Sequence, residues 1–102
     1  MSLTKHRLQQ LVIIAEAALE KELIQTVKRL GAHGYTVAEV RAGGLGGDRE
    51  GAWEADRTIR MEVICRPAVA DEIAEHVLAV YAPHYGVSLF FTAAEVIRPE
   101  RF

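Results

Sequence analysis

Apolar positions follow two different periodicities along the chain, and the first half of the pattern predicts a strand and a helix. The run Leu11-Val12-Ile13-Ile14 is apolar at consecutive positions, which indicates a strand over Leu8–Ala15 that is covered on both faces. Spacings of three and four predict a helix from Ala17 to about Ala32, and its apolar stripe is Leu19, Leu23, Val27 and Leu30. Gly31 and Gly34 bracket the helix exit, where a left-handed backbone is cheap only for glycine.

Three more strands are predicted further along the chain. β-Branched and aromatic residues are typical of strands and indicate one at Tyr35–Val40. Strict alternation indicates another at Thr58–Arg66. Gly86 then turns the chain into the last strand, Val87–Ile97. The positions that face one way in the third strand are Ile59, Met61, Val63 and Cys65.

A second helix is predicted between the last two strands. Pro67 begins this helix, because proline suits the first helical position. Asp71 and Glu72 lie in its early turns, where the helix dipole favours acidic side chains. Pro83 ends it, since proline cannot continue a helix. The apolar stripe of this helix is Val69, Ile73, Val77 and either Val80 or Tyr81.

The elements occur in the order strand, helix, strand, strand, helix, strand. That order predicts a single α+β domain over residues 1–102 with a ferredoxin-like βαββαβ fold, in which an antiparallel sheet carries both helices on one face. The last strand is apolar on both sides, with Leu89 and Phe91 facing one way and Phe90 and Val96 the other. Because an apolar face of this size is rarely left in water, we expect a homo-oligomer whose sheets pack together.

Residues 41–56 interrupt every periodic pattern and contain five of the eight glycines. Long segments of this kind are usually functional or mobile. Glycine lets several backbone N–H groups approach one anion, and arginine forks suit phosphate or carboxylate. The arginines in and beyond this segment that could serve are Arg41, Arg49, Arg98 and Arg101. The residues alone leave open whether the glycine run binds an anion or only connects two strands.

Composition narrows the classes of function. Half of the residues are hydrophobic and 25% are charged, which is typical of a folded domain. The net charge of -2 argues against an electrostatically driven nucleic-acid binder. The apolar run at 11–15 is too short to span a membrane. We therefore expect a cytoplasmic protein that binds no nucleic acid and is not embedded in a membrane.

Candidate catalytic chemistry is sparse in the sequence. It contains no nucleophile elbow or metal motif, so we do not expect an enzyme. The single cysteine, Cys65, is in phase with Met61 and Val63, which predicts a buried thiol rather than a nucleophile. Arg60 and Glu62 alternate on one strand face, and this pattern predicts a cross-strand or intersubunit ion pair.

The segment Leu30–Val40 resembles the helix-exit and second-strand signature of PII signalling proteins. That signature is Leu-Gly, two residues, Gly, an apolar residue, Thr-Val, one residue and Glu-Val. Residues 41–56 stand where these proteins carry their T-loop, and Ile59–Ile64 is similar to the strand that leaves it. The resemblance covers residues 8 to 98. Gly34-Tyr35-Thr36-Val37 and Ala94-Glu95-Val96 are similar to the PII-like branch associated with bicarbonate transporters and carboxysomes.

This resemblance implies a homotrimer that binds adenine nucleotides in clefts between its subunits. It implies that Ile13 and Ile64 flank the adenine ring, Thr36 hydrogen-bonds the base and Glu62 lies near the ribose. The other positions implied to contact the nucleotide are Gly43, Gly44, Gly86, Val87, Arg98 and Arg101. The positions implied to form an anion- or partner-binding loop are Arg41, Gly46, Gly47, Arg49 and Trp53.

The resemblance also implies signalling through the T-loop to a partner in inorganic-carbon uptake or concentration, such as a bicarbonate transporter or a carboxysome-related protein, with bicarbonate as a further ligand. The loop before the last strand is reduced to Pro83–Val87, which favours AMP or ADP over ATP; ATP and cyclic AMP remain candidates. Trp53 is either a partner anchor or packs on its own trimer.

Two alternatives stay open: a scaffold trimer that needs no ligand, and a small ferredoxin-like phosphate-ester hydrolase. The hydrolase would need a phosphate loop after the first strand, where this chain has Ala15-Glu16-Ala17-Ala18.

Overall fold

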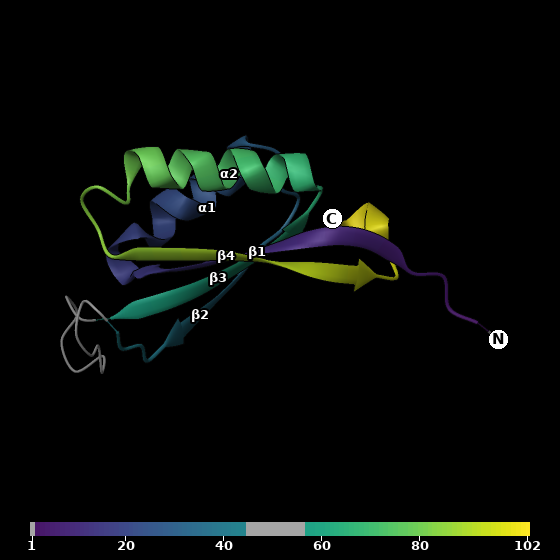
Figure 1. The fold of residues 1–102 in the computed structure, drawn as a ribbon, viewed down its shortest axis with the longest axis horizontal. Helices are drawn as coiled ribbons and strands as arrows, with labels where there is room; N and C mark the ends of the chain where they lie inside the picture. Colours follow the sequence, from purple (N-terminus) through teal and green to yellow (C-terminus); the bar gives the residue numbers. More distant parts are fainter. Residues whose placement is uncertain (1, 45–56) are drawn as a thin grey trace.

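A computed structural model describes residues 2–44 and 57–102 of the chain (Figure 1). The strands are β1 (His6–Glu16), β2 (Thr36–Val40), β3 (Thr58–Cys65) and β4 (Val87–Val96). The α-helices are α1 (Glu20–Arg29) and α2 (Pro67–Val80), and short 3-10 turns are η1 (Ala17–Leu19) and η3 (Pro99–Arg101). Neither helix in this part of the chain is long and apolar enough to cross a membrane.

The strands form one antiparallel sheet in the order β2-β3-β1-β4. Both helices lie on the same face of this sheet, and β1 and β4 extend beyond them toward the C-terminus (Figure 1). The ferredoxin-like fold predicted from the order of elements is therefore confirmed. The opposite face of the sheet carries no helix, and we call it the open face.

The core lies between the sheet and the two helices. Every second residue of β1 and β3 points into it, as strand geometry requires. The predicted set Ile59, Met61, Val63 and Cys65 is buried. Burial also raises the pKa of the Cys65 thiol, because a thiolate would lose its hydration there, and the predicted burial of this thiol is confirmed.

The first helix is shorter than the periodicity predicted. Its first turn, Ala17–Leu19, is a 3-10 turn, and the α-helix ends at Arg29 instead of continuing to Ala32. Leu30 and Ala32 close the end by donating backbone hydrogen bonds to Thr26 and Val27. These hydrogen bonds satisfy the last carbonyls, and the chain then leaves the helix axis.

The second helix settles the choice between Val80 and Tyr81. Val80 is exposed, whereas the Tyr81 ring packs on the core and its hydroxyl lies 3.2 Å from Thr26 Oγ1 on α1. Pro67 occupies the first turn as predicted. Asp71 and Glu72 lie in the second turn, which agrees with the prediction that they occupy the early turns of the helix.

Gly31 and Gly34 follow the end of α1 as predicted, and the left-handed backbone expected at this exit is found at Gly31. Gly31 has φ of 111°, and it is the single glycine of the described chain with positive φ. A Cβ at Gly31 would meet Val69 at 3.7 Å, which is ordinary contact, so a substitution there costs backbone strain and not a clash. Gly34 has open space around it.

Gly31→Ala is expected to lower the free energy of unfolding by about 1–2 kcal/mol, because an L residue is strained at positive φ. Gly34→Ala is the matched control and should change it by less than about 0.5 kcal/mol or raise it slightly. Urea denaturation at one fixed protein concentration would measure both. Equal losses for the two variants would contradict the assignment of strain to Gly31.

Strand β4 leaves a large apolar surface uncovered in the single chain. It is an edge strand, with Phe90 40% and Phe91 41% exposed, and Ile97 just beyond it is 59% exposed. Exposed apolar edge strands favour pairing with another chain. We therefore expect the interface between copies of the chain to include this surface.

Candidate functional site

A row of side chains crosses the open face at the middle of the sheet. Thr36 on β2 pairs in register with Glu62 on β3, Glu62 pairs with Val12 on β1, and Val12 pairs with Phe90 on β4. Directly opposite residues have Cβ atoms about 5 Å apart, so Thr36 and Glu62 lie side by side. The structure thus brings together the two residues implied to contact the base and the ribose.

Arg60 connects the two sides of this row. Its Nε donates to Glu62 Oε2 at 3.0 Å, and its guanidinium carbon lies 5.7 Å from the centroid of the Phe90 ring. Arg60 therefore reaches from β3 to β4 across β1, and this accounts for the complete burial of Val12 on a face that has no helix. The predicted ion pair exists and joins two residues of the same strand, so the cross-strand geometry predicted for it is wrong, while an intersubunit pairing stays a prediction.

The role implied for the Ile13 side chain needs correction. Ile13 pairs with Met61 and Leu89 on the helix-covered face and has no exposed surface, so its side chain belongs to the core and cannot flank a ligand. Its neighbour Ile14 points to the open face, opposite Arg60 and Ser88, and is partly exposed. Sequence reasoning missed Ile14 because an unbroken apolar run carries no alternation to fix its phase.

Ile64, which the resemblance implied to flank the adenine ring, lies on the open face two residues beyond Glu62 on β3. It is partly buried and pairs in register with Gln10, whose Oε1 accepts a hydrogen bond of 2.8 Å from Thr92. The open face therefore combines aliphatic side chains from β1 and β3 with the hydroxyl of Thr36 and the carboxylate of Glu62. Such a mixture suits a flat ligand with an apolar ring and polar edges.

The glycines at the end of β2 lie at one end of the sheet. Arg41, Gly43 and Gly44 follow Val40, which pairs with Thr58 beside Glu16. Gly86 reaches the same end, and its N–H donates to the Glu16 carboxylate. The Val87 side chain packs on the core, so it offers a ligand no more than its backbone. Gly46, Gly47, Arg49 and Trp53 lie outside the described residues.

An ion pair joins β2 to the residue that precedes β3. Arg57 Nε and a terminal nitrogen of Arg57 donate to the two carboxylate oxygens of Glu39 at 2.9 and 2.8 Å. The Arg57 guanidinium holds the pKa of Glu39 below its ordinary value. The Arg57 carbonyl accepts a hydrogen bond from the N–H of Ala17 at 2.9 Å. Side chain and backbone together fix the point where the chain re-enters the sheet.

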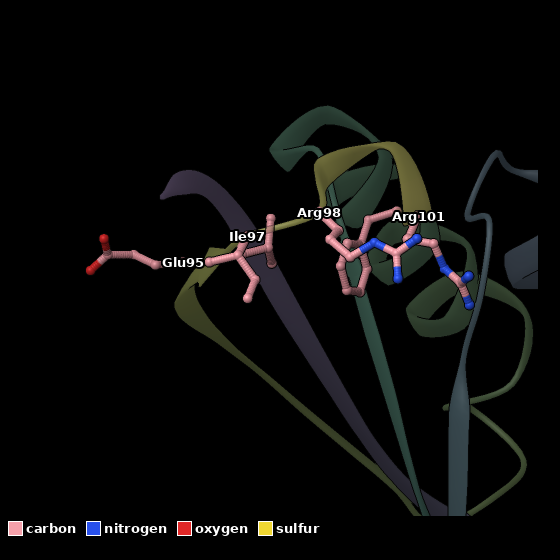
Figure 2. A pocket seen from close by; sticks show the side chains of 6 residues that line it. Glu95, Ile97, Arg98 and Arg101 are labelled. Carbon is pink, nitrogen blue, oxygen red and sulfur yellow. The ribbon is translucent and has the colours of Figure 1, made fainter. Parts of the chain in front are cut away.

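A groove of about 540 Å³ lies at the opposite end of the molecule. Figure 2 shows Arg98 and Arg101 extending in the same direction while Glu95 points away from them. Arg98 meets Glu100 only at 3.5 Å, and both side chains are about two-thirds exposed, so this contact competes weakly with a ligand anion. The residues that line the groove are Glu95, Val96, Ile97, Arg98, Arg101 and Phe102.

These two ends are far apart within one chain. Glu16 marks the glycine end of β1 and His6, which pairs with Val96, marks the arginine end. Ten residue steps along a strand amount to about 33 Å, much longer than a nucleoside diphosphate. A single nucleotide therefore cannot touch Gly44 and Arg98 of the same chain.

The described residues hold no group of three or more histidine, cysteine, aspartate or glutamate side chains that could bind a metal ion. The two ends and the open face offer a ligand arginine forks, backbone N–H groups, hydroxyls and the carboxylates of Glu16, Glu62 and Glu95. Together they can bind anions and polar groups.

The βαββαβ order, the antiparallel sheet and the long connection between β2 and β3 define a ferredoxin-like domain of the PII type. Residues 8–101 match the family model described as nitrogen regulatory protein P-II, and the chain belongs to that family.

Solved structures share this fold. A PII-like signaling protein from Thermus thermophilus is 37% identical, with 98% of this chain and 99% of that chain covered and a TM-score of 0.85. CPII from Thiomonas intermedia is a nitrogen regulatory PII-like protein, and its structure is bound to ADP, AMP and bicarbonate. It is 23% identical, with 99% of this chain and 98% of that chain covered and a TM-score of 0.88. A DUF3240 family protein from Shewanella baltica is 19% identical, with 90% of each chain covered and a TM-score of 0.66. No curated protein matches the chain.

Proposed function

We propose that this protein is a trimeric regulatory protein that binds adenine nucleotides between its subunits and acts in the cytoplasm. The observation that carries the proposal is the row on the open face, where Thr36 and Glu62 lie in register beside aliphatic residues. A P-II family member with this row has a hydroxyl for the base, a carboxylate for the ribose and apolar walls for the ring.

The nucleoside would span the open face between Ile14 on β1 and Ile64 on β3, which lie on opposite sides of the Thr36–Glu62 row and about 13 Å apart along the strands. Thr36 would hydrogen-bond the base, and Glu62 would accept hydrogen bonds from ribose hydroxyls. A purine contributes a large flat surface that such aliphatic side chains can cover, and the polar groups fix its orientation.

The phosphates would lie between two copies of the chain. Gly43 and Gly44 at one end of the sheet would offer backbone N–H groups, and Arg98 and Arg101 of a neighbouring subunit would offer guanidinium forks. Gly86 lies at the same end, but its N–H donates to the Glu16 carboxylate and would have to leave it to reach a phosphate. The distance of about 33 Å between these ends within one chain supports a shared site, because only a second copy can bring them together.

The exposed side of β4 is the surface we assign to subunit contacts. Phe90, Phe91 and Ile97 would be removed from water there. Complete burial of a fully exposed side chain of this size contributes about 1.5–3 kcal/mol, and since these three are 40–59% exposed, each favours assembly by about half of that. A homotrimer satisfies both requirements: it covers this strand and creates clefts between neighbouring chains.

ADP or AMP is favoured over ATP, since the segment before β4 is short and offers few donors for a third phosphate. CPII is bound to ADP, AMP and bicarbonate, and this supports bicarbonate as a further ligand here.

Residues 41–56 would act as the T-loop. Its residues Arg41, Arg49 and Trp53 would contact a partner in inorganic-carbon uptake or concentration. A ligand can shift the equilibrium between two conformations of that loop only as far as its affinities for the two conformations differ.

Titration calorimetry with AMP, ADP, ATP and cyclic AMP, each with and without bicarbonate, tests the proposal. We expect saturable binding of ADP and AMP at about one site per subunit of a trimer. An intact trimer that binds no nucleotide would favour the scaffold alternative, and release of phosphate during the titration would favour the hydrolase. A protein that is monomeric at all concentrations would contradict the shared site.

A further inference from the structure

We propose that Arg60 is a positioning residue that holds the Glu62 carboxylate for ribose and thereby makes the site prefer ribonucleotides to 2′-deoxyribonucleotides. The inference rests on the proposed nucleotide function and adds to it a determinant of sugar specificity. Arg60 does not itself touch the ligand in this arrangement; it acts through Glu62.

The first support is how the Glu62 carboxylate is engaged. Arg60 Nε donates to Oε2 at 3.0 Å, and no other hydrogen bond to Glu62 occurs in the part of the chain that the structure describes. One carboxylate oxygen is thus held by the protein while Oε1 remains an acceptor. A glutamate side chain on the open face that makes no hydrogen bond samples several rotamers. The hydrogen bond to one carboxylate oxygen removes that freedom before the ligand binds.

The second support is that Arg60 is itself held at two points. Its guanidinium lies 5.7 Å from the Phe90 ring centroid while its Nε bonds Glu62, so the planar group lies across the buried Val12. A planar guanidinium can stack on a ring and donate in its own plane at the same time, and a lysine ammonium cannot do both. The Glu62 orientation therefore depends on the shape of arginine and not only on its charge.

Ribose specificity follows from the single free acceptor. A ribose hydroxyl can donate to Oε1, and a charge-assisted hydrogen bond of this kind is stronger than a neutral one. The proposal places the 2′-hydroxyl on Oε1, so a 2′-deoxyribose, which keeps its 3′-hydroxyl, leaves this oxygen facing a C–H group. Sites built to hydrogen-bond a hydroxyl reject analogues that lack it, because a desolvated acceptor is left unpaired.

The chain offers a matched control in the Arg57–Glu39 pair. The Arg57 and Glu39 side chains are 39% and 51% exposed, against 37% and 38% for Arg60 and Glu62, and both pairs join an arginine on the β3 side to a glutamate. Glu39 lies opposite Ile59, whose side chain is in the core, so this pair is on the other face of the sheet. Its loss should not change how Glu62 faces a ligand.

The experiment compares dissociation constants for ADP and 2′-deoxyADP by calorimetry. We expect the intact protein to prefer ADP about tenfold and Arg60→Gln to reduce that preference to about twofold. Arg60→Lys keeps the charge and should lose most of the preference as well. Arg57→Gln should leave the ratio unchanged, whatever it does to both affinities together, and Glu62→Gln sets the value expected when the carboxylate is absent.

A ratio that stays near tenfold in both Arg60→Gln and Arg60→Lys would overturn the inference while leaving nucleotide binding in place. A ratio near one in the intact protein would overturn it too. If the intact protein binds neither nucleotide, the proposed function fails first and the inference fails with it. Should Arg60→Gln not fold, as judged by circular dichroism and by mass in solution, the lysine variant decides the outcome.

Discussion

Replacing Arg98 and Arg101 together with alanine is expected to weaken ADP binding about a hundredfold and to leave adenosine binding within about twofold of its original value. Both guanidinium groups extend from the same groove, and the weak contact of Arg98 with Glu100 does not neutralise it. Each fork provides charge-assisted hydrogen bonds to phosphate oxygens, and adenosine has no phosphate to receive them. The loss should therefore grow from adenosine through AMP to ADP.

Calorimetric titration of that ligand series would measure the effect at one salt concentration, because charge contacts weaken as salt rises. Arg7→Ala is the matched control: Arg7 pairs in register with Glu95 at the same end of the sheet but does not line the groove. It should change all three affinities by less than about twofold. Equal losses of adenosine and ADP in the double variant would contradict the role given to Arg98 and Arg101.

Mixing two defective variants is expected to restore ADP binding, which is the second large effect. One variant carries Arg98→Ala and Arg101→Ala; the other carries Gly44→Asp. A Cβ at Gly44 meets no atom within 4 Å, so aspartate fits the fold and repels phosphate only through its charge. Each variant alone should bind ADP poorly.

A mixed trimer contains one neighbouring pair in which an intact Gly44 faces intact arginines. Purification through two different affinity tags isolates such trimers, and calorimetry should then find about one ADP per trimer. If the glycine end and the arginine end of the same chain formed the site, every chain in the mixture would carry one defect and no site would return. An absence of restored binding in verified mixed trimers would thus reject the shared site.

Much of the fold was predictable from local pattern. The alternation of Ile59, Met61, Val63 and Cys65 set the face of β3 correctly, and Pro67 marked the start of α2. The features that were misplaced or left open were those that local pattern does not encode. The end of α1 depends on backbone hydrogen bonds to Thr26 and Val27, and the choice of Tyr81 over Val80 depends on a partner 55 residues away.

The candidate site was predictable in part. Thr36, Glu62 and Ile64 were named from a resemblance, and the structure brings all three to the open face. Ile13 was placed on the wrong face because four consecutive apolar residues give two equally good phases. The contact between Arg60 and Phe90 was not predictable, since it joins β3 to β4 across β1.

By itself the sequence determined the order of elements, the family and the kinds of side chain available to a ligand, because periodicity, glycine and proline act on neighbouring residues along the chain. Only the tertiary structure decided which of Ile13 and Ile14 faces outward, how Arg60 holds Glu62, and that the glycine and arginine ends lie at opposite ends of one sheet. Register between strands fixes all three, and register arises from contacts between residues far apart in sequence.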